Sequence, residues 1–137
     1  MSAFELDPQL AADTHAVGDL GLSRVLLMDD VRFPWLILVP RRAGMRELID
    51  LPRAEQHVLL DEIERCATAL RNMDKPDKLN VAALGNVVAQ LHVHVIARTR
   101  QDAAWPRPVW GIGARIAYDD SALQRRLSSL RAALLMQ

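Results

Sequence analysis

The chain has 137 residues, half of them apolar, and its seventeen basic and seventeen acidic side chains leave no formal net charge. This size suits one domain spanning residues 1–137 with a real hydrophobic core. The balanced charge argues against a nucleic-acid polymer or an anionic membrane as partner. The single cysteine, Cys66, excludes an intrachain disulfide framework, and no apolar run has transmembrane length or resembles a signal segment. We therefore expect a cytoplasmic protein.

The N-terminal third predicts one helix and three strands. A short helix is expected over residues 4–12, because Asp7 suits the N-cap and Pro8 the first helical position. Three apolar runs then predict strands, over residues 14–17, 24–28 and 35–39. Acidic and proline residues separate the second run from the third, which favours an antiparallel hairpin.

A long amphipathic helix is predicted over residues 53–71, ending before a polar stretch that contains Pro76. Its apolar stripe consists of residues 58, 59, 60, 63, 66, 67 and 70. A strand over 79–84 follows, and the Gly85-Asn86 turn predicts that it pairs antiparallel with a strand over 90–98.

Beyond this strand, the segment 102–111 is too rich in proline for a helix interior. A last helix is predicted to begin near Asp119 and to run to about Met136. The predicted fold class is therefore α+β: a five-stranded antiparallel sheet with one long helix and a C-terminal helix.

Polar and apolar residues alternate over the start of the last strand, which is the period of a β-strand. Gln90, His92 and His94 therefore face one side of the sheet, and the apolar residues between them face the core. Such a polar face needs water, a metal, a ligand or chemistry to satisfy it. Solvation by water and binding of a metal are both open interpretations of this polar face. However, no cysteine pair or further histidine cluster completes a four-ligand set, so no metal or cofactor is predicted.

The segment Gln90-Leu91-His92-Val93-His94-Val95-Ile96 resembles the signature of the histidine-triad (HIT) superfamily of nucleotidyl hydrolases and transferases. In that signature three histidines alternate with apolar residues, and Gln90 stands in place of the first. Further similar segments extend the resemblance to roughly residues 4–112, namely 36–42, 79–86 and 96–98. Within the superfamily the chain is most similar to the bacterial branch described as diadenosine-polyphosphate-hydrolase-like.

The resemblance implies cleavage at the α-phosphate of a dinucleoside polyphosphate or a nucleoside phosphoramidate through a nucleotidyl-histidine, so that two easier steps replace one hard step. It places the nucleophile at His92 and a phosphate ligand at His94. It also implies that the main-chain carbonyl of Gln90 orients His92. The substitution at position 90 would then remove only one donor from the phosphate site.

Other positions are binding candidates or departures from the family. Asn86 retains an amide donor where the family often has a hydroxyl residue, and Trp35 replaces a histidine that the family often carries. The remaining candidates for substrate binding are Asn80, Asp29 and Trp105.

The resemblance also implies a homodimer joined through the long helix and the edge strand, which the apolar stripe could support. Two alternatives to an enzyme are kept. One is a nucleotide-binding sensor without turnover, and the other is a histidine-based metal-binding protein.

Overall fold

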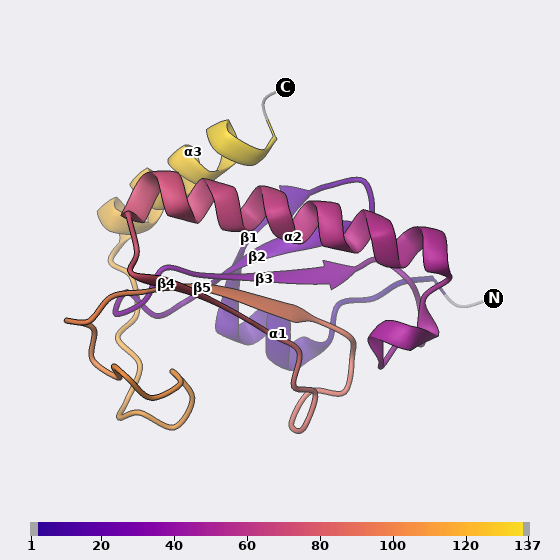
Figure 1. Ribbon diagram of the computed structural model, residues 1–137, viewed down its shortest axis with the longest axis horizontal. Coiled ribbons are helices and arrows are strands. Elements are labelled where there is room, and N and C mark those ends of the chain that lie inside the picture. The colour runs from indigo at the N-terminus through magenta and orange to yellow at the C-terminus, as the bar shows by residue number, and fades with distance from the viewer. Residues whose placement is uncertain (1–2, 136–137) are drawn as a thin grey trace.

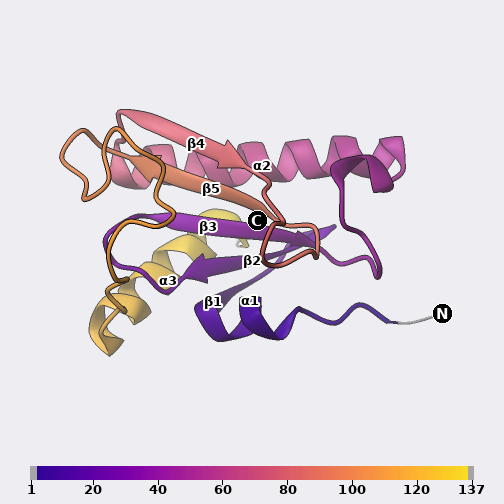
Figure 2. The same ribbon diagram turned by 90° about the horizontal axis from the view of Figure 1, so that it is seen from below.

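The computed structural model describes residues 3–135. Its elements are α1 (Pro8–Asp13), β1 (Thr14–Asp19), β2 (Ser23–Met28), β3 (Trp35–Pro40), the short 3-10 helix η1 (Leu48–Asp50), α2 (Arg53–Asp74), β4 (Lys78–Ala82), β5 (Val93–Arg98) and α3 (Asp120–Leu134). The strands form one antiparallel sheet in the order β1-β2-β3-β5-β4 (Figure 2). Helices α2 and α3 cover one face, and α1 lies on the other (Figure 1). The predicted fold class is confirmed.

The helix ends agree with the capping residues of the sequence. Asp7 accepts a hydrogen bond from the main-chain N–H of Gln9 at 2.8 Å, so α1 begins at Pro8, and residues 3–7 precede it without helical structure. Asp119 caps α3 in the same way. The predicted end of this helix at Met136 lies outside the described residues. Helix α2 runs to Asp74, three residues beyond its predicted end, where the Asp74 carboxylate pairs with Arg126 of α3 at 2.9 Å.

The predicted pairing of the last two strands is confirmed, with Ala82 opposite His94, but the tight turn between them is wrong. Residues 83–92 form an irregular loop. Gly85 within it has a φ of +76°, in the left-handed region that favours glycine. The main-chain N–H of Leu91 donates to the carbonyl of Met45 instead of to β4. Because of that contact, β5 begins at Val93 and not at residue 90.

Both faces of the central strands β2, β3 and β5 are largely buried. On the side of α2 and α3, Leu91, Val93 and Val95 of the histidine strand enter the main core as predicted, and Ala97 joins them. On the other side a second core forms beneath α1 and the proline-rich segment, from residues that include Leu10, Phe33, Trp35, Ile37, Ile96 and Val109. The polar face of the histidine strand is therefore covered and not solvated.

The apolar stripe of α2 packs mainly inside the chain. Leu59, Cys66 and Leu70 are buried against the sheet, while Val58 and Leu60 are exposed. The stripe as a whole is thus not a free face for a second copy, contrary to the expectation from the sequence. The homodimer stays a prediction without that support. Among residues 3–135, no helix combines the length and the apolar character that a membrane crossing requires.

Candidate active site

His92 lies immediately before β5, and its own main chain orients its ring. The Nδ1 atom of His92 is 2.6 Å from the main-chain oxygen of Gln90. Since a carbonyl oxygen only accepts hydrogen bonds, Nδ1 carries the proton, and the Nε2 atom of the neutral ring holds a free electron pair. The orienting contact expected from the family resemblance is present. His92 is 7% exposed, so its ring is held within the protein.

His94 lies on the same face two residues further on and is 4% exposed. The indole Nε1–H of Trp35 donates to the Nδ1 atom of His94 at 3.0 Å. Burial, and secondarily the neighbouring His92, lower the pKa of His94 to about 4. His94 is therefore a neutral side chain around pH 7.

The two imidazole rings are 4.9 Å apart and meet edge to face. Trp110 of the proline-rich segment packs on His94, with its ring 5.0 Å from that of His94 and 5.8 Å from that of Trp35. Both histidines lie on the face of the sheet opposite α2, because the alternate residues of this strand enter the core beneath α2. The proline-rich segment folds back onto the same face.

The side chain of Gln90 binds the N-terminal segment. Its Oε1 atom accepts from the main-chain N–H of Asp7, and its Nε2 atom donates to the carbonyl of Glu5, each at 2.9 Å. The amide thus spans the backbone just before α1. Gln90 contributes its main-chain carbonyl to His92, the role that the family resemblance implies, while its side chain binds the N-terminal segment.

This division of roles predicts that Gln90→Ala retains hydrolysis, because the carbonyl that orients His92 remains. Loss of two hydrogen bonds to the N-terminal segment should lower the free energy of unfolding by about 1–3 kcal/mol. Urea denaturation, exchange of the Asp7 amide proton and turnover assays would measure these effects. Gln90→Glu is the matched control, since it keeps the acceptor for Asp7 but sets an oxygen against the carbonyl of Glu5. Complete loss of turnover in a folded Gln90→Ala variant would show that the side chain is essential.

Three of the four other predicted binding residues have partners away from the two histidines. Asn80 accepts from Arg98 at 2.9 Å, and Trp105 lies over the same guanidinium group, 5.8 Å from its central carbon. Asp29 accepts from the main-chain N–H of Tyr118 at 3.0 Å, and its carboxylate lies 3.1 Å from His15. Asn86 is exposed on the loop 83–92. The structure does not gather these four residues at one site, and their roles toward a substrate stay predictions.

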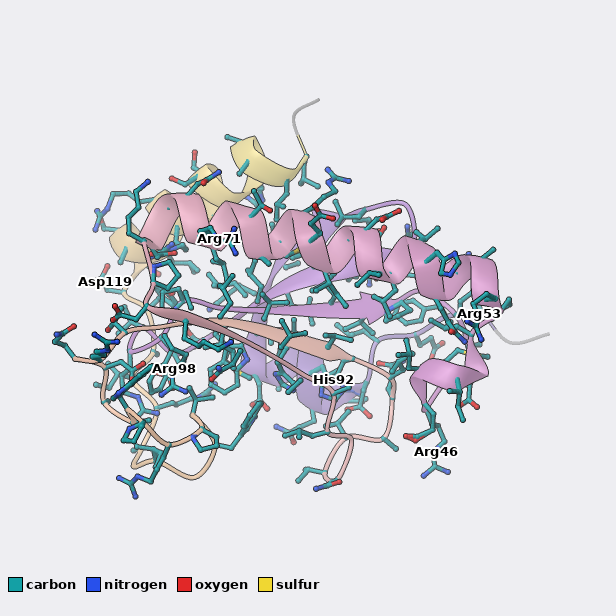
Figure 3. All side chains as sticks on the ribbon, viewed as in Figure 1. Arg46, Arg53, Arg71, His92, Arg98 and Asp119 are labelled. Carbon is teal, nitrogen blue, oxygen red and sulfur yellow. The ribbon has the colours of Figure 1, made fainter. Side chains whose placement is uncertain are left out.

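Trp110, and not the candidate Trp105, is the tryptophan of the proline-rich segment that contacts His94. No local signal distinguishes the two, because each stands next to a proline or a glycine in one short segment. Arg98, at the other end of β5 from His92 (Figure 3), is 2% exposed and pairs with Asp102 at 2.7 Å. Its charge is therefore neutralised within the chain.

One pocket is lined by His92, and a second lies against the two tryptophans that contact His94. A small one, of about 30 Å³, is lined by His92 together with Arg46 and Glu47. A larger one, of about 220 Å³, has apolar walls that include Trp35 and Trp110. Its charged lining residues are Asp13, Asp30, Arg32 and Arg115. An apolar cavity with a few polar groups at its rim is the usual form of a small-molecule site.

Within residues 3–135, no group of three or more histidine, cysteine, aspartate or glutamate side chains is arranged to hold a metal ion. The metal-binding alternative therefore lacks a third ligand beside His92 and His94 in the described part of the chain.

Comparison with known proteins identifies the family. The family model described as the HIT domain matches residues 9–101, which is most of the chain. The chain therefore belongs to the HIT domain family, whose members bind nucleotides. A search of curated proteins finds no match.

Solved structures from bacteria are similar over almost the whole chain. A histidine triad protein from Bradyrhizobium japonicum is 50% identical, with a TM-score of 0.95 over 97% of this chain and 99% of the other. One from Marinobacter aquaeolei is 44% identical, with a TM-score of 0.94 over 97% of each chain. One from Sinorhizobium meliloti is 41% identical, with a TM-score of 0.93 over 96% of this chain and 97% of the other. The similarity thus extends beyond the family match into the segment that carries Trp110 and into α3.

Proposed function

We propose that this protein is a nucleotidyl hydrolase or transferase that uses His92 as its nucleophile. The observation that carries the proposal is the 2.6 Å contact between the Nδ1 atom of His92 and the Gln90 carbonyl. This contact leaves the electron pair on Nε2, and a ring held in one orientation needs little further ordering to attack.

The reaction has two displacement steps. The Nε2 atom of His92 forms a bond to the α-phosphorus while the bond to the leaving group breaks, and the leaving group departs with the electron pair of that bond. Water then attacks the same phosphorus and loses a proton to solvent, the electron pair of the phosphorus–nitrogen bond returns to Nε2 of His92, and a nucleoside monophosphate is released. An amine leaving group takes up a proton from solvent in the first step. In both steps the neutral ring of His94 donates a hydrogen bond to the phosphoryl oxygens.

The pocket walled by Trp35 and Trp110 suits the nucleoside portion of the substrate. Its volume of about 220 Å³ and its aromatic walls can accept a purine or pyrimidine ring. The side chains of Asp13 and Arg115 at its lining can bind polar edges of the base or the ribose. The small pocket beside His92 then lies on the side of the leaving group.

The charges around both pockets favour a substrate with one phosphate. Arg46 and Glu47 balance each other at the small pocket. At the larger one, Arg32 pairs with Asp30 at 2.8 Å, and Arg115 lies 3.9 Å from Asp13. A polyphosphate chain would meet no excess of cations here. We therefore rank nucleoside phosphoramidates above dinucleoside polyphosphates, the substrates that the resemblance to the diadenosine-polyphosphate-hydrolase-like branch suggests.

A panel of substrates tests this function. Adenosine and guanosine phosphoramidates and the corresponding dinucleoside tetraphosphates are incubated with the protein at equal concentration, and release of nucleoside monophosphate is followed by chromatography. We expect release from the phosphoramidates first. Binding of nucleotide without release from any substrate would replace the enzyme with the sensor alternative.

A further inference from the structure

Trp35 stands where the family often carries a histidine, and its indole N–H donates a hydrogen bond to His94. Unlike a histidine, an indole does not change its protonation near pH 7. We propose that Trp35 is a positioning residue that holds His94 as the tautomer with its proton on Nε2, so that His94 presents an N–H group to the substrate. The nature of that substrate rests on the proposed function. The tautomer of His94 is independent of the proposed function, and it can be measured without turnover.

The geometry defines the tautomer because an indole N–H can only donate. It lies 3.0 Å from the Nδ1 atom of His94, and both side chains are buried. A proton on Nδ1 would set two donors against each other in the protein interior, where an unsatisfied donor is costly. The remaining neutral form carries its proton on Nε2.

The sheet and the aromatic cluster hold the indole in place. Ile37 of β3 lies opposite His94 of β5, and Trp35 is two residues from Ile37, so it is the diagonal neighbour of His94 on the same face. Phe33 packs edge to face on the Trp35 ring at 6.3 Å, and Trp110 does the same at 5.8 Å. The donor is thus positioned before any ligand arrives.

His92 and His94 consequently take opposite tautomers. His92 has its proton on Nδ1, bound to the Gln90 carbonyl, which leaves an electron pair on Nε2. His94 accepts at Nδ1 and carries its proton on Nε2. One ring is prepared for attack and its neighbour for donation. The lowered pKa of His94, which results from burial and from His92, agrees with an uncharged ring.

Nuclear magnetic resonance of protein labelled with ¹⁵N tests the assignment directly. In the wild-type protein at pH 7 we expect His94 to show an unprotonated Nδ1 and a protonated Nε2. A scalar coupling should connect His94 Nδ1 with Trp35 Nε1 across the hydrogen bond. A protonated Nδ1, or a doubly protonated ring, would overturn the proposal.

Two variants separate the donor from mere packing. Trp35→Phe keeps an aromatic ring but should lose the coupling and shift the His94 nitrogens toward the average of two exchanging tautomers. Trp110→Phe, which also removes an indole beside His94, should leave the His94 tautomer unchanged. An unaltered pattern in Trp35→Phe would contradict the proposal. If Trp35→Phe does not fold, the wild-type coupling alone decides.

Kinetics then test the consequence for the reaction. With a substrate that the wild type cleaves, kcat of Trp35→Phe should fall by roughly tenfold, the equivalent of one hydrogen bond, with little change in KM. An unchanged kcat together with a lost tautomer would refute the donor role. If the wild type cleaves nothing, the proposed function fails, while the spectra still decide the tautomer.

Discussion

The His92→Ala variant is expected to lose turnover by about a thousandfold or more, which corresponds to roughly 4 kcal/mol of transition-state stabilisation. The substitution removes the atom that forms the bond to phosphorus, so the covalent route closes. Binding of a nucleoside monophosphate should change little, because the aromatic pocket remains. Steady-state kinetics and calorimetric titration measure the two effects separately.

His94→Ala provides the comparison for this variant. It removes a donor to the phosphoryl oxygens and leaves the nucleophile, so binding and rate should both weaken. If His92→Ala turns over near the wild-type rate while His94→Ala is inactive, the nucleophile has been assigned to the wrong ring.

The largest effect on stability is expected for Asp102→Ala, at about 3–5 kcal/mol of unfolding free energy. The Asp102 carboxylate accepts two hydrogen bonds from the buried guanidinium of Arg98, at 2.7 and 3.1 Å. It also accepts from the main-chain N–H groups of Thr99, Ala104 and Trp105. Alanine would leave a buried charge unpaired and release the start of the proline-rich segment.

Urea denaturation measures this loss, and Asp102→Asn is the matched control, since an amide oxygen still accepts from the main chain. The control should be destabilised less than the alanine variant. Because Trp110 belongs to the same segment, nucleotide binding should weaken in parallel in Asp102→Ala. Wild-type stability in Asp102→Ala would show that the Arg98 pair does not hold the segment.

Local patterns were sufficient to predict most of the fold. Capping residues such as Asp7 and Asp119 mark helix ends through contacts within three residues along the chain. The alternation from Gln90 to Val95 determines which side chains enter the core, since a strand has a period of two. The family resemblance, and not the local pattern, assigned the chemical roles on that strand: His92 as nucleophile, His94 as phosphate ligand and the Gln90 carbonyl as the group that orients His92.

Contacts between distant parts of the chain could not be predicted. Gln90 binds residues 83 and 85 positions away, and Trp35 donates to a histidine 59 positions away. Neither spacing has a local signature. The burial of Arg98 depends in the same way on how the proline-rich segment folds back. The chain's specific features at the site therefore appear only in three dimensions.

The most direct test of His92 as a nucleophile is to trap the intermediate. Wild-type protein is mixed with a substrate labelled at the α-phosphate and quenched in base, because a phosphorus–nitrogen bond to histidine is labile in acid. Cleavage after Lys78 and Arg98 yields a peptide over 79–98 that contains both histidines, and fragmentation between them locates the adduct. We predict a nucleotidyl group on His92 that is absent from His92→Ala. A label on His94, or product formed in a single turnover without any adduct, would contradict this mechanism.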